Sequence, residues 1–177
     1  MIANDMQGDN KLVFDFGSRD KLGQWVIVND DVMGGLSESE LHLSDEGTAI
    51  FEGTLSLENF GGFASVRSVP YAYDLKGYQG LAVRVRGDGR RYVLRFRTDR
   101  KADGPAYEAE FETARDTWIT VYVPFQETAP TFHGKRLEGF PKLEGERVKQ
   151  IGLMIADKQP GPFRLELAWI QAYRPRW

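Results

Sequence analysis

The sequence predicts an all-β protein folded as a two-layer sandwich. About ten short runs alternate between apolar and polar residues, which is the side-chain period of a strand with one buried face. Gly, Pro, Asn and Asp separate these runs at short intervals, and no stretch shows the apolar period of an amphipathic helix. Many short strands with frequent turn residues are typical of sandwiches and barrels.

The first predicted strands lie at 12–16, 25–28, 41–43, 49–57 and 63–69. Along 49–57 the faces are well separated, with Phe51 on the apolar side and Glu52 on the polar side. Pro70 ends the last of these strands because proline cannot donate a ladder hydrogen bond. Residues 71–78 are expected to form an irregular turn or one helical turn.

The later strands are predicted at 81–86, 92–97, 107–112, 118–125, 151–156 and 163–170. Gly-Asp-Gly-Arg at 87–90 is predicted to be the turn of a hairpin. The run 118–125 is apolar on both faces apart from Thr120, which predicts a central strand. The segment 126–149 is expected to be a long loop that either is functional or contains structure that the pattern does not reveal.

Charged residues mark the outward faces of three of these strands. The side chains are Arg84 and Arg86, Arg95 and Arg97, and Glu108, Glu110 and Glu112. Considered alone, the arginines would form an anion-binding patch. Glutamates on a neighbouring strand would neutralise them, and we favour this interpretation because it fits the small net charge of −3.

Length and composition fit one soluble domain spanning residues 1–177, with a loose N-terminus at 1–10. The chain is 41% hydrophobic and 28% charged, which is ordinary for a globular protein. The negative net charge argues against a nucleic-acid grip through phosphate neutralisation. The absence of cysteine excludes disulfides, thiolate metal sites and a cysteine nucleophile.

A cytoplasmic location is expected from the sequence. No apolar run approaches the roughly 20 residues that a membrane span requires. The N-terminal residues are acidic and polar, unlike a signal peptide or an Arg-rich transit peptide. A mitochondrial location would require that a presequence had been removed.

Two turns, each closed by a pair of glycines, are the best candidates for shaped surface. Polar residues at 29–31 precede the Gly-Gly pair at 34–35, and Asn59 precedes the pair at 61–62. A diglycine serves a backbone that takes a positive φ or passes close to another segment. The turns are therefore either tight connections without a ligand or a binding surface.

No catalytic or metal-binding motif stands out, so we predict a chain that is not an enzyme and holds no cofactor. His42 lies in a short strand and His133 in the long loop, and no nucleophile, zinc or phosphate-loop motif accompanies them. Asp30 and Asp31 are adjacent and would point to opposite faces of a strand. No metal site is predicted, although a structural Ca²⁺ near Asp15 is left open.

A carbohydrate-binding module is the alternative function. Sugar-binding sandwiches use exposed aromatic rings as flat apolar platforms in an open groove. The candidate rings are Trp25, Tyr71, Tyr73, Tyr78, Trp118 and Trp177. Trp118 and Trp169 lie in core-like runs, so most of these rings are expected to be structural.

The residues around the two diglycine turns resemble those of a known family. They are Trp25, Val28, Asn29, Asp30, Asp31, Val32, Met33, Gly34, Gly35, Leu36 and Ser37, followed by Leu55, Ser56, Leu57, Glu58, Asn59, Gly61, Gly62, Phe63, Ala64, Ser65, Val66 and Arg67. Later segments at 81–92 and 151–170 fit as well. Over nearly its whole length the chain is similar to the complex I intermediate-associated protein 30 family, named after an assembly factor of NADH:ubiquinone oxidoreductase.

This resemblance implies a jelly-roll β-sandwich of the galactose-binding type. It also implies a non-catalytic, chaperone-like assembly factor, because the family associates with intermediates of a respiratory membrane complex and related domains serve photosynthetic ones. The expected partners are protein subunits of a membrane oxidoreductase or its intermediates, with a sugar ligand as the alternative and no nucleic acid. The expected binding residues are Trp25, Asn29, Asp30, Asp31, Asn59, Ser65, Arg67, Asp157, Lys158 and Gln159.

Overall fold

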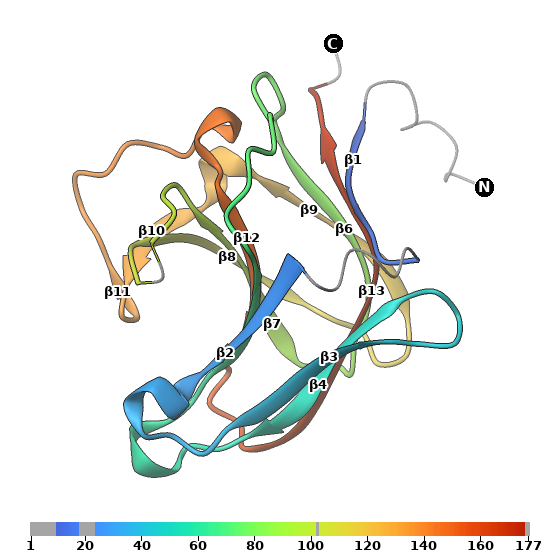
Figure 1. Ribbon diagram of the computed structural model, residues 1–177, viewed down its shortest axis with the longest axis vertical. Coiled ribbons are helices and arrows are strands. Elements are labelled where there is room, and N and C mark those ends of the chain that lie inside the picture. The colour runs from blue at the N-terminus through green and yellow to red at the C-terminus, as the bar shows by residue number, and fades with distance from the viewer. Residues whose placement is uncertain (1–9, 18–23, 102, 176–177) are drawn as a thin grey trace.

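Two antiparallel β-sheets pack face to face in the computed structural model, which describes residues 10–17, 24–101 and 103–175 (Figure 1). The six-stranded sheet has the order β3-β4-β13-β6-β9, with β1 also paired to β13. The seven-stranded sheet has the order β11-β10-β8-β7-β12-β5-β2. The described residues contain short 3-10 turns but no α-helix, which confirms the predicted all-β class. The predicted loose N-terminus falls outside the described residues except for Asn10.

The first sheet contains β1 (Lys11–Asp15), β3 (Glu38–Leu43), β4 (Ala49–Leu55), β6 (Gly80–Arg86), β9 (Trp118–Pro124) and β13 (Gly161–Tyr173). The second contains β2 (Trp25–Asn29), β5 (Ala64–Ser68), β7 (Arg91–Arg97), β8 (Ala106–Glu112), β10 (Ala129–Phe132), β11 (Lys135–Arg136) and β12 (Gln150–Ile155). The 3-10 turns are η2 (Asp30–Met33), η3 (Glu58–Phe60), η4 (Phe125–Glu127) and η5 (Gly145–Arg147).

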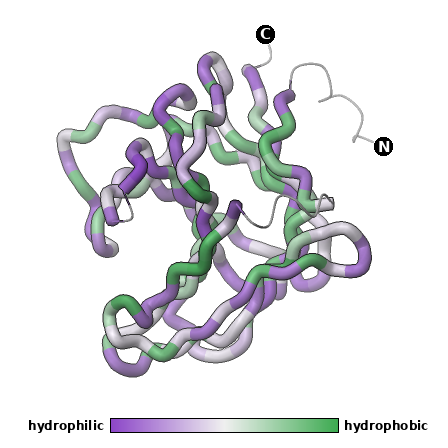
Figure 2. Tube along the Cα trace, in the orientation of Figure 1, coloured by the Kyte–Doolittle hydropathy of each residue, from purple (hydrophilic) through white to green (hydrophobic). Residues whose placement is uncertain are grey.

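The hydrophobic core lies between the inner faces of the two sheets. Tyr92, Leu94 and Phe96 of β7 are fully buried and share one cluster with Phe51 of β4 and Leu165 of β13. The residues between them in sequence point outward because side chains alternate along a strand. Figure 2 shows the same alternation of apolar and hydrophilic residues along the strands. Burial therefore fixes the sandwich and leaves its outer faces and end turns free for binding.

The predicted hairpin between β6 and β7 is wrong, because these strands belong to different sheets. β6 pairs with β9 and β13, whereas β7 pairs with β8 and β12. Asp88 anchors the crossing: its carboxylate accepts hydrogen bonds from the Tyr92 hydroxyl at 3.0 Å and from the Arg164 backbone N–H at 2.8 Å. The Asp-Gly turn signal is satisfied by these longer-range contacts instead of by pairing of the flanking strands.

β9 was predicted to be central but is an edge strand of the six-stranded sheet, paired only to β6 among the described strands. Its outward rings pack against neighbouring side chains instead of another strand, and Tyr122 remains 46% exposed. The guanidinium of Arg86 lies 5.1 Å from the centroid of the Trp118 ring, and Tyr122 packs edge-on against Tyr173 at 5.5 Å. These contacts explain why the strand carries apolar residues on both faces.

The segment 126–149, predicted to be a long loop with a role or structure of its own, contains the β10–β11 hairpin and η5. His133 and Gly134 form its two-residue turn with φ of 50° and 77°. Two consecutive positive φ values are typical of a hairpin turn that matches the twist of its strands. Because β10 pairs with β8, the hairpin extends one edge of the seven-stranded sheet.

Candidate functional site

A buried carboxylate joins the two diglycine turns at one end of the sandwich, where η2 and η3 lie side by side (Figure 1). Asp30 has no exposed surface. One of its oxygens accepts a hydrogen bond from the Ser37 N–H at 3.0 Å. The other accepts from the Ser37 hydroxyl at 2.6 Å and from the N–H groups of Gly62 and Phe63 at 2.7 and 3.3 Å. This one side chain therefore holds segments about thirty residues apart in the sequence.

Each glycine pair contains one residue with a positive φ and one residue that another segment approaches closely, as expected. Gly34 and Gly62 have φ of 86° and 138°, which other residues rarely adopt. Gly35 and Gly61 pack against Asp30, and a Cβ at these positions would lie 2.4 and 2.6 Å from atoms of its carboxyl group. The diglycine prediction is confirmed on both counts, since one glycine turns the chain and the other admits the carboxylate.

Hydrogen bonds stabilise the negative charge of Asp30 in its buried position. Burial alone would raise the pKa of Asp30, but the hydrogen bonds from Ser37, Gly62 and Phe63 outweigh it and hold that pKa below its ordinary value. A carboxylate that accepts several short hydrogen bonds orders the backbone that donates them. The two turns are thus presented as one ordered unit.

Exposed apolar side chains gather on these ordered turns, in a group that we call the apolar tip. The residues and exposed fractions are Val32 70%, Met33 60%, Leu36 53%, Leu57 41% and Phe60 92%. Figure 2 shows the apolar colour on the turn that follows β2, at the lower left. Phe60 and Asn59 both have positive φ, of 62° and 55°. Two adjacent left-handed residues are costly and hold the Phe60 ring away from the core.

Other predicted residues at these turns divide into structural and exposed ones. Asn29 is buried, and its side-chain oxygen accepts hydrogen bonds from the Ser39 hydroxyl at 2.8 Å and the Ser65 N–H at 3.2 Å. Ser65 is buried and its hydroxyl donates to the Val28 carbonyl. Asp31 and Asn59 are exposed. The buried pair supports the turns, and the exposed pair borders the apolar tip in sequence.

The 156–160 loop lies at the same end of the sandwich, since Ile155 pairs with Ala64 at the start of β5. Asp157 is buried and forms two hydrogen bonds with Arg90, at 2.9 and 2.6 Å. Burial would raise the pKa of Asp157, but the Arg90 guanidinium lowers it below the ordinary value. Lys158 and Gln159 are exposed on the turn that this ion pair supports.

Two predicted residues lie away from these turns. Trp25 is buried in an aromatic cluster, 4.9 Å from Phe14 and 5.8 Å from Phe16 between ring centroids. Arg67 is half-buried on the outer face of the seven-stranded sheet. The predicted residues therefore do not form one site, although most of them lie at one end of the molecule.

The candidate sugar platforms are spread over the protein. Tyr73 is buried and donates a hydrogen bond to Ser68 at 2.6 Å, and Tyr78 lies under the guanidinium of Arg174. Tyr71 is 61% exposed. Trp118 lies on the outer face of the other sheet, and Trp177 falls outside the described residues. The candidate rings that the structure describes therefore do not form one row.

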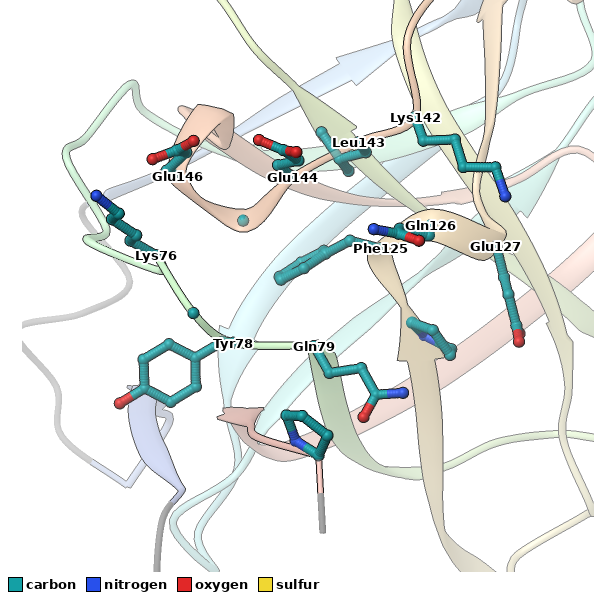
Figure 3. Close-up of a pocket in the computed structure, with 14 residues that line it drawn as sticks. Lys76, Tyr78, Gln79, Phe125, Gln126, Glu127, Lys142, Leu143, Glu144 and Glu146 are labelled. Atoms are coloured by element: carbon teal, nitrogen blue, oxygen red, sulfur yellow. The ribbon is translucent and has the colours of Figure 1, made fainter. Parts of the chain in front are cut away.

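An open groove of about 710 Å³ lies at the other side of the fold, between residues 76–79, η4 and residues 142–146 (Figure 3). Lys76 and Glu146 lie on one side of it, and Glu127 and Lys142 on the other, with the Phe125 ring between them. The lining residues include no histidine or hydroxyl nucleophile beyond the tyrosine. The groove therefore offers a concave surface of mixed charge.

One cluster has the donor types of a metal site. Glu40, His42 and Glu52 lie on the outer face of β3 and β4, with ligand atoms within 4.8 Å of one another. The hydrogen bond to Glu52, at 2.9 Å, raises the pKa of His42 above its ordinary value. Arg164 already places a guanidinium 3.6 Å from Glu52, so the charge of this carboxylate is balanced within the protein. Asp15 caps its own turn by accepting the Gly17 N–H at 3.0 Å.

The prediction that glutamates neutralise one face of arginines is confirmed only in part. Arg84 and Arg86 lie on one sheet and Arg95 and Arg97 on the other, so the four do not share a face. Arg86 pairs with Glu166 and Arg95 with Glu108, at 2.7 and 2.9 Å. Arg97 forms no ion pair with the described residues and is buried. The alternation showed which residues point outward but could not show which strands are neighbours.

Fold comparison places the chain among jelly-roll sandwiches. It superposes on the family 11 carbohydrate-binding module of a Clostridium thermocellum cellulosomal cellulase with a TM-score of 0.68 and 13% identity, covering 94% of this chain and 95% of that one. An agarase matches with a TM-score of 0.63 and 14% identity over 94% of this chain and 25% of the agarase. Such identities show the fold alone. The protein therefore shares the fold of these β-sandwiches, in agreement with the jelly-roll sandwich that the family resemblance implied.

Sequence comparison shows the family. The profile described as "Complex I intermediate-associated protein 30 (CIA30)" matches residues 14–167, and the chain belongs to this family. The protein named "Complex I intermediate-associated protein 30, mitochondrial" is 28% identical in Mus musculus over 92% of this chain. The Drosophila melanogaster protein of that name is 27% identical over 92%. The match spans 56% and 62% of these two relatives.

Proposed function

We propose that this chain is a non-catalytic binding domain that associates, in a chaperone-like way, with assembly intermediates of respiratory complex I. Membership of the family supports this proposal, and the apolar tip is the observation that carries it. Exposed apolar clusters on soluble proteins mark surfaces that bind other molecules. An intermediate in assembly offers a complementary surface, because its own subunit interfaces are still uncovered.

The construction of the apolar tip favours binding to protein. Protein interfaces are centred on aromatic and aliphatic side chains, and a few of these supply most of the affinity. Phe60 is 92% exposed and is presented by backbone that Asp30 holds in place. A surface ordered before binding loses less conformational freedom in the complex. Phe60 is thus the proposed anchor.

The buried acids support a non-catalytic role. Burial would raise the pKa values of Asp30, Asp157 and Glu166, but hydrogen bonds from neighbouring side chains lower all three below their ordinary values. A general acid or base works best when its pKa lies near the working pH. These carboxylates stay charged and bonded, so they serve as supports of the fold.

Sugar binding is the second candidate, and the seven-stranded sheet lacks a platform for it. The outward residues of the central strands β5, β7 and β12 are charged, polar or aliphatic: Ser65, Arg67, Arg91, Val93, Arg95, Arg97, Gln150, Gly152 and Met154. An aromatic floor is what a stacked sugar ring needs. We therefore keep the protein-binding proposal ahead of it.

The site of action follows from the partner. The relatives in mouse and fruit fly are named as mitochondrial proteins, whereas the sequence alone predicts a cytoplasmic location. None of the helices among the described residues has the length and apolar character of a membrane crossing. We propose that this chain works where complex I intermediates are assembled, in contact with their protein subunits.

Affinity purification from the native organism tests this function. We expect complex I subunits, quantified by mass spectrometry, to co-purify with the tagged chain and to fall about tenfold with Phe60→Ser, the loss of one anchor. Phe140→Ser, which changes a 46% exposed ring in another loop, is the matched control and should leave recovery unchanged. Recovery no higher than from an untagged strain, or equal recovery with Phe60→Ser, would contradict the proposal.

A further inference from the structure

Three arginines lie together on the outer face of the seven-stranded sheet, which is a different surface from the apolar tip. Arg67, Gly152 and Arg95 lie in one row, because Gly152 pairs with Arg67 of β5 on one side and with Arg95 of β7 on the other. Arg97 lies in the next row, opposite Gln150. Together these five residues line a depression of about 10 Å³.

The positive charge in this depression is only partly balanced. Arg95 pairs with Glu108 at 2.9 Å. Arg97 is 8% exposed, and the one acceptor that it contacts among the described residues is the Gly104 carbonyl at 2.7 Å. Arg67 has no hydrogen bond or ion pair within the part of the chain that the structure describes. The buried charge of Arg97 thus has a neutral carbonyl as acceptor and no ion-pair partner among the described residues, and an approaching anion would supply one.

The pKa values show the same imbalance. Burial, together with the neighbouring Arg95 and Arg67, lowers the pKa of Arg97 to about 10. Burial and Arg95 also lower the pKa of Arg67. Asp103 in the loop after β7 acts in the opposite direction on both pKa values, and Asp99 does so on that of Arg97, although the Asp103 carboxylate also pairs with His133 at 3.3 Å. A bound anion would relieve the repulsion between the guanidinium groups.

Gly152 keeps the space between the arginines open. A Cβ at this position would lie 3.2 Å from the Cβ of Arg67, which is tighter than ordinary contact. Glycine inside a strand weakens the strand and often marks a place that a ligand approaches closely. Its position in the row leaves no side chain between Arg67 and Arg95.

The row on the other side of the arginine row carries aliphatic side chains and one serine. Val28 pairs with Ser65, Ser65 with Met154, and Met154 with Val93, so aliphatic side chains lie beside the arginine row. A free phosphate would leave this row unused. A peptide that carries carboxylates next to apolar side chains would cover both rows.

We propose that this face binds an acidic segment of a protein partner, with one Asp or Glu carboxylate held at the mouth of the depression by Arg67, Arg95 and Arg97. Guanidinium groups suit this ligand because they bind carboxylate oxygens in pairs. The inference rests on the proposed function only in that the ligand is a protein, and it concerns a different surface from the apolar tip.

Isothermal titration at low salt tests the proposal with three probes: a short N-acetylated, C-amidated peptide of alternating Glu and Val, the same peptide with Gln for Glu, and inorganic phosphate. We expect the Glu peptide to bind at least about tenfold more tightly than the Gln peptide, and Arg67→Gln to remove most of that difference. Arg91→Gln, on the same face of β7 but outside the depression, is the matched control and should bind within about twofold of the unchanged chain.

Gly152→Ala is a second variant, and it retains every charge. It should weaken binding of the Glu peptide, because the added methyl group narrows the space beside Arg67. Equal binding of the Glu and Gln peptides, no effect of Arg67→Gln, or binding of phosphate without the peptide would each overturn the proposal. Such a failure would leave the co-purification of complex I subunits and its loss with Phe60→Ser intact, so it can be told apart from failure of the proposed function.

Discussion

Replacing Asp30 with Asn tests whether this carboxylate holds the two turns together. The amide can keep its oxygen where the Gly62 and Phe63 N–H groups and the Ser37 hydroxyl now donate, but its NH₂ group would then face the Ser37 N–H, which donates to the other carboxylate oxygen. One buried donor would lose its acceptor, at about 1–3 kcal/mol, and the three remaining hydrogen bonds would no longer have a charged acceptor. We therefore expect a loss of about 2–4 kcal/mol in the free energy of unfolding.

Urea unfolding at neutral pH measures this loss, and Asp31→Asn is the matched control. Asp31 is the next residue and is exposed, so its substitution should change the free energy of unfolding by less than about 0.5 kcal/mol. An Asp30→Asn protein within that range of the unchanged chain would refute the reasoning. So would equal losses in the two variants, since the effect would then come from net charge alone.

The pH dependence gives the loss a signature. The pKa of Asp30 is lower in the folded state than its ordinary value of 3.8. Its contribution to stability is therefore fully present above pH 3.8 and is lost as the pH falls through the folded pKa. The difference between the unchanged chain and Asp30→Asn should be constant from neutral pH down to about pH 5 and should shrink in stronger acid. A difference that grows on acidification would contradict this.

Three further substitutions test other contacts that stabilise the fold, again by urea unfolding. Arg90→Met should cost about 3–5 kcal/mol, because it leaves Asp157 buried without its partner, and a loss below about 1 kcal/mol would show that the pair is dispensable. Gly35→Ala should cost about 1–3 kcal/mol by pressing a methyl group against Asp30, and no change would mean that the turn can yield. For His42, whose pKa is raised above 6.5, the stabilisation should be present below pH 6.5 and lost as the pH rises through the folded pKa; His42→Gln should abolish that slope, and persistence of the slope would assign it to another group.

The strands and their faces were predictable because alternation is a local property. β7 carries Tyr92, Leu94 and Phe96 inward and its arginines outward, as the pattern indicates. The partners of each strand were not predictable, because pairing depends on contacts between distant segments. The Asp-Gly signal at 88–89 suggested a hairpin, yet Asp88 reaches Arg164 and directs the chain to the other sheet.

The two turns of the candidate site could be singled out from the sequence, but the role of each residue in them could not. The glycine pairs correctly marked backbone under steric constraint, but no local signal showed that Asp30 would be buried and bonded across the turns. The apolar tip was overlooked because Phe60 lies within a polar turn, where an aromatic residue is itself the unusual feature. The cluster of Arg97 and Gly152 could not be predicted, because it depends on the pairing of β7 with β12.

Amide hydrogen exchange of the chain, alone and within the complex that co-purifies with it, tests most directly whether the apolar tip docks on a protein. We predict slower exchange on binding in residues 57–63 and 32–37, which carry Phe60 and its neighbours, and unchanged exchange in the β10–β11 hairpin. Protection confined to the hairpin or to the groove near Phe125, with none at the two turns, would contradict the account.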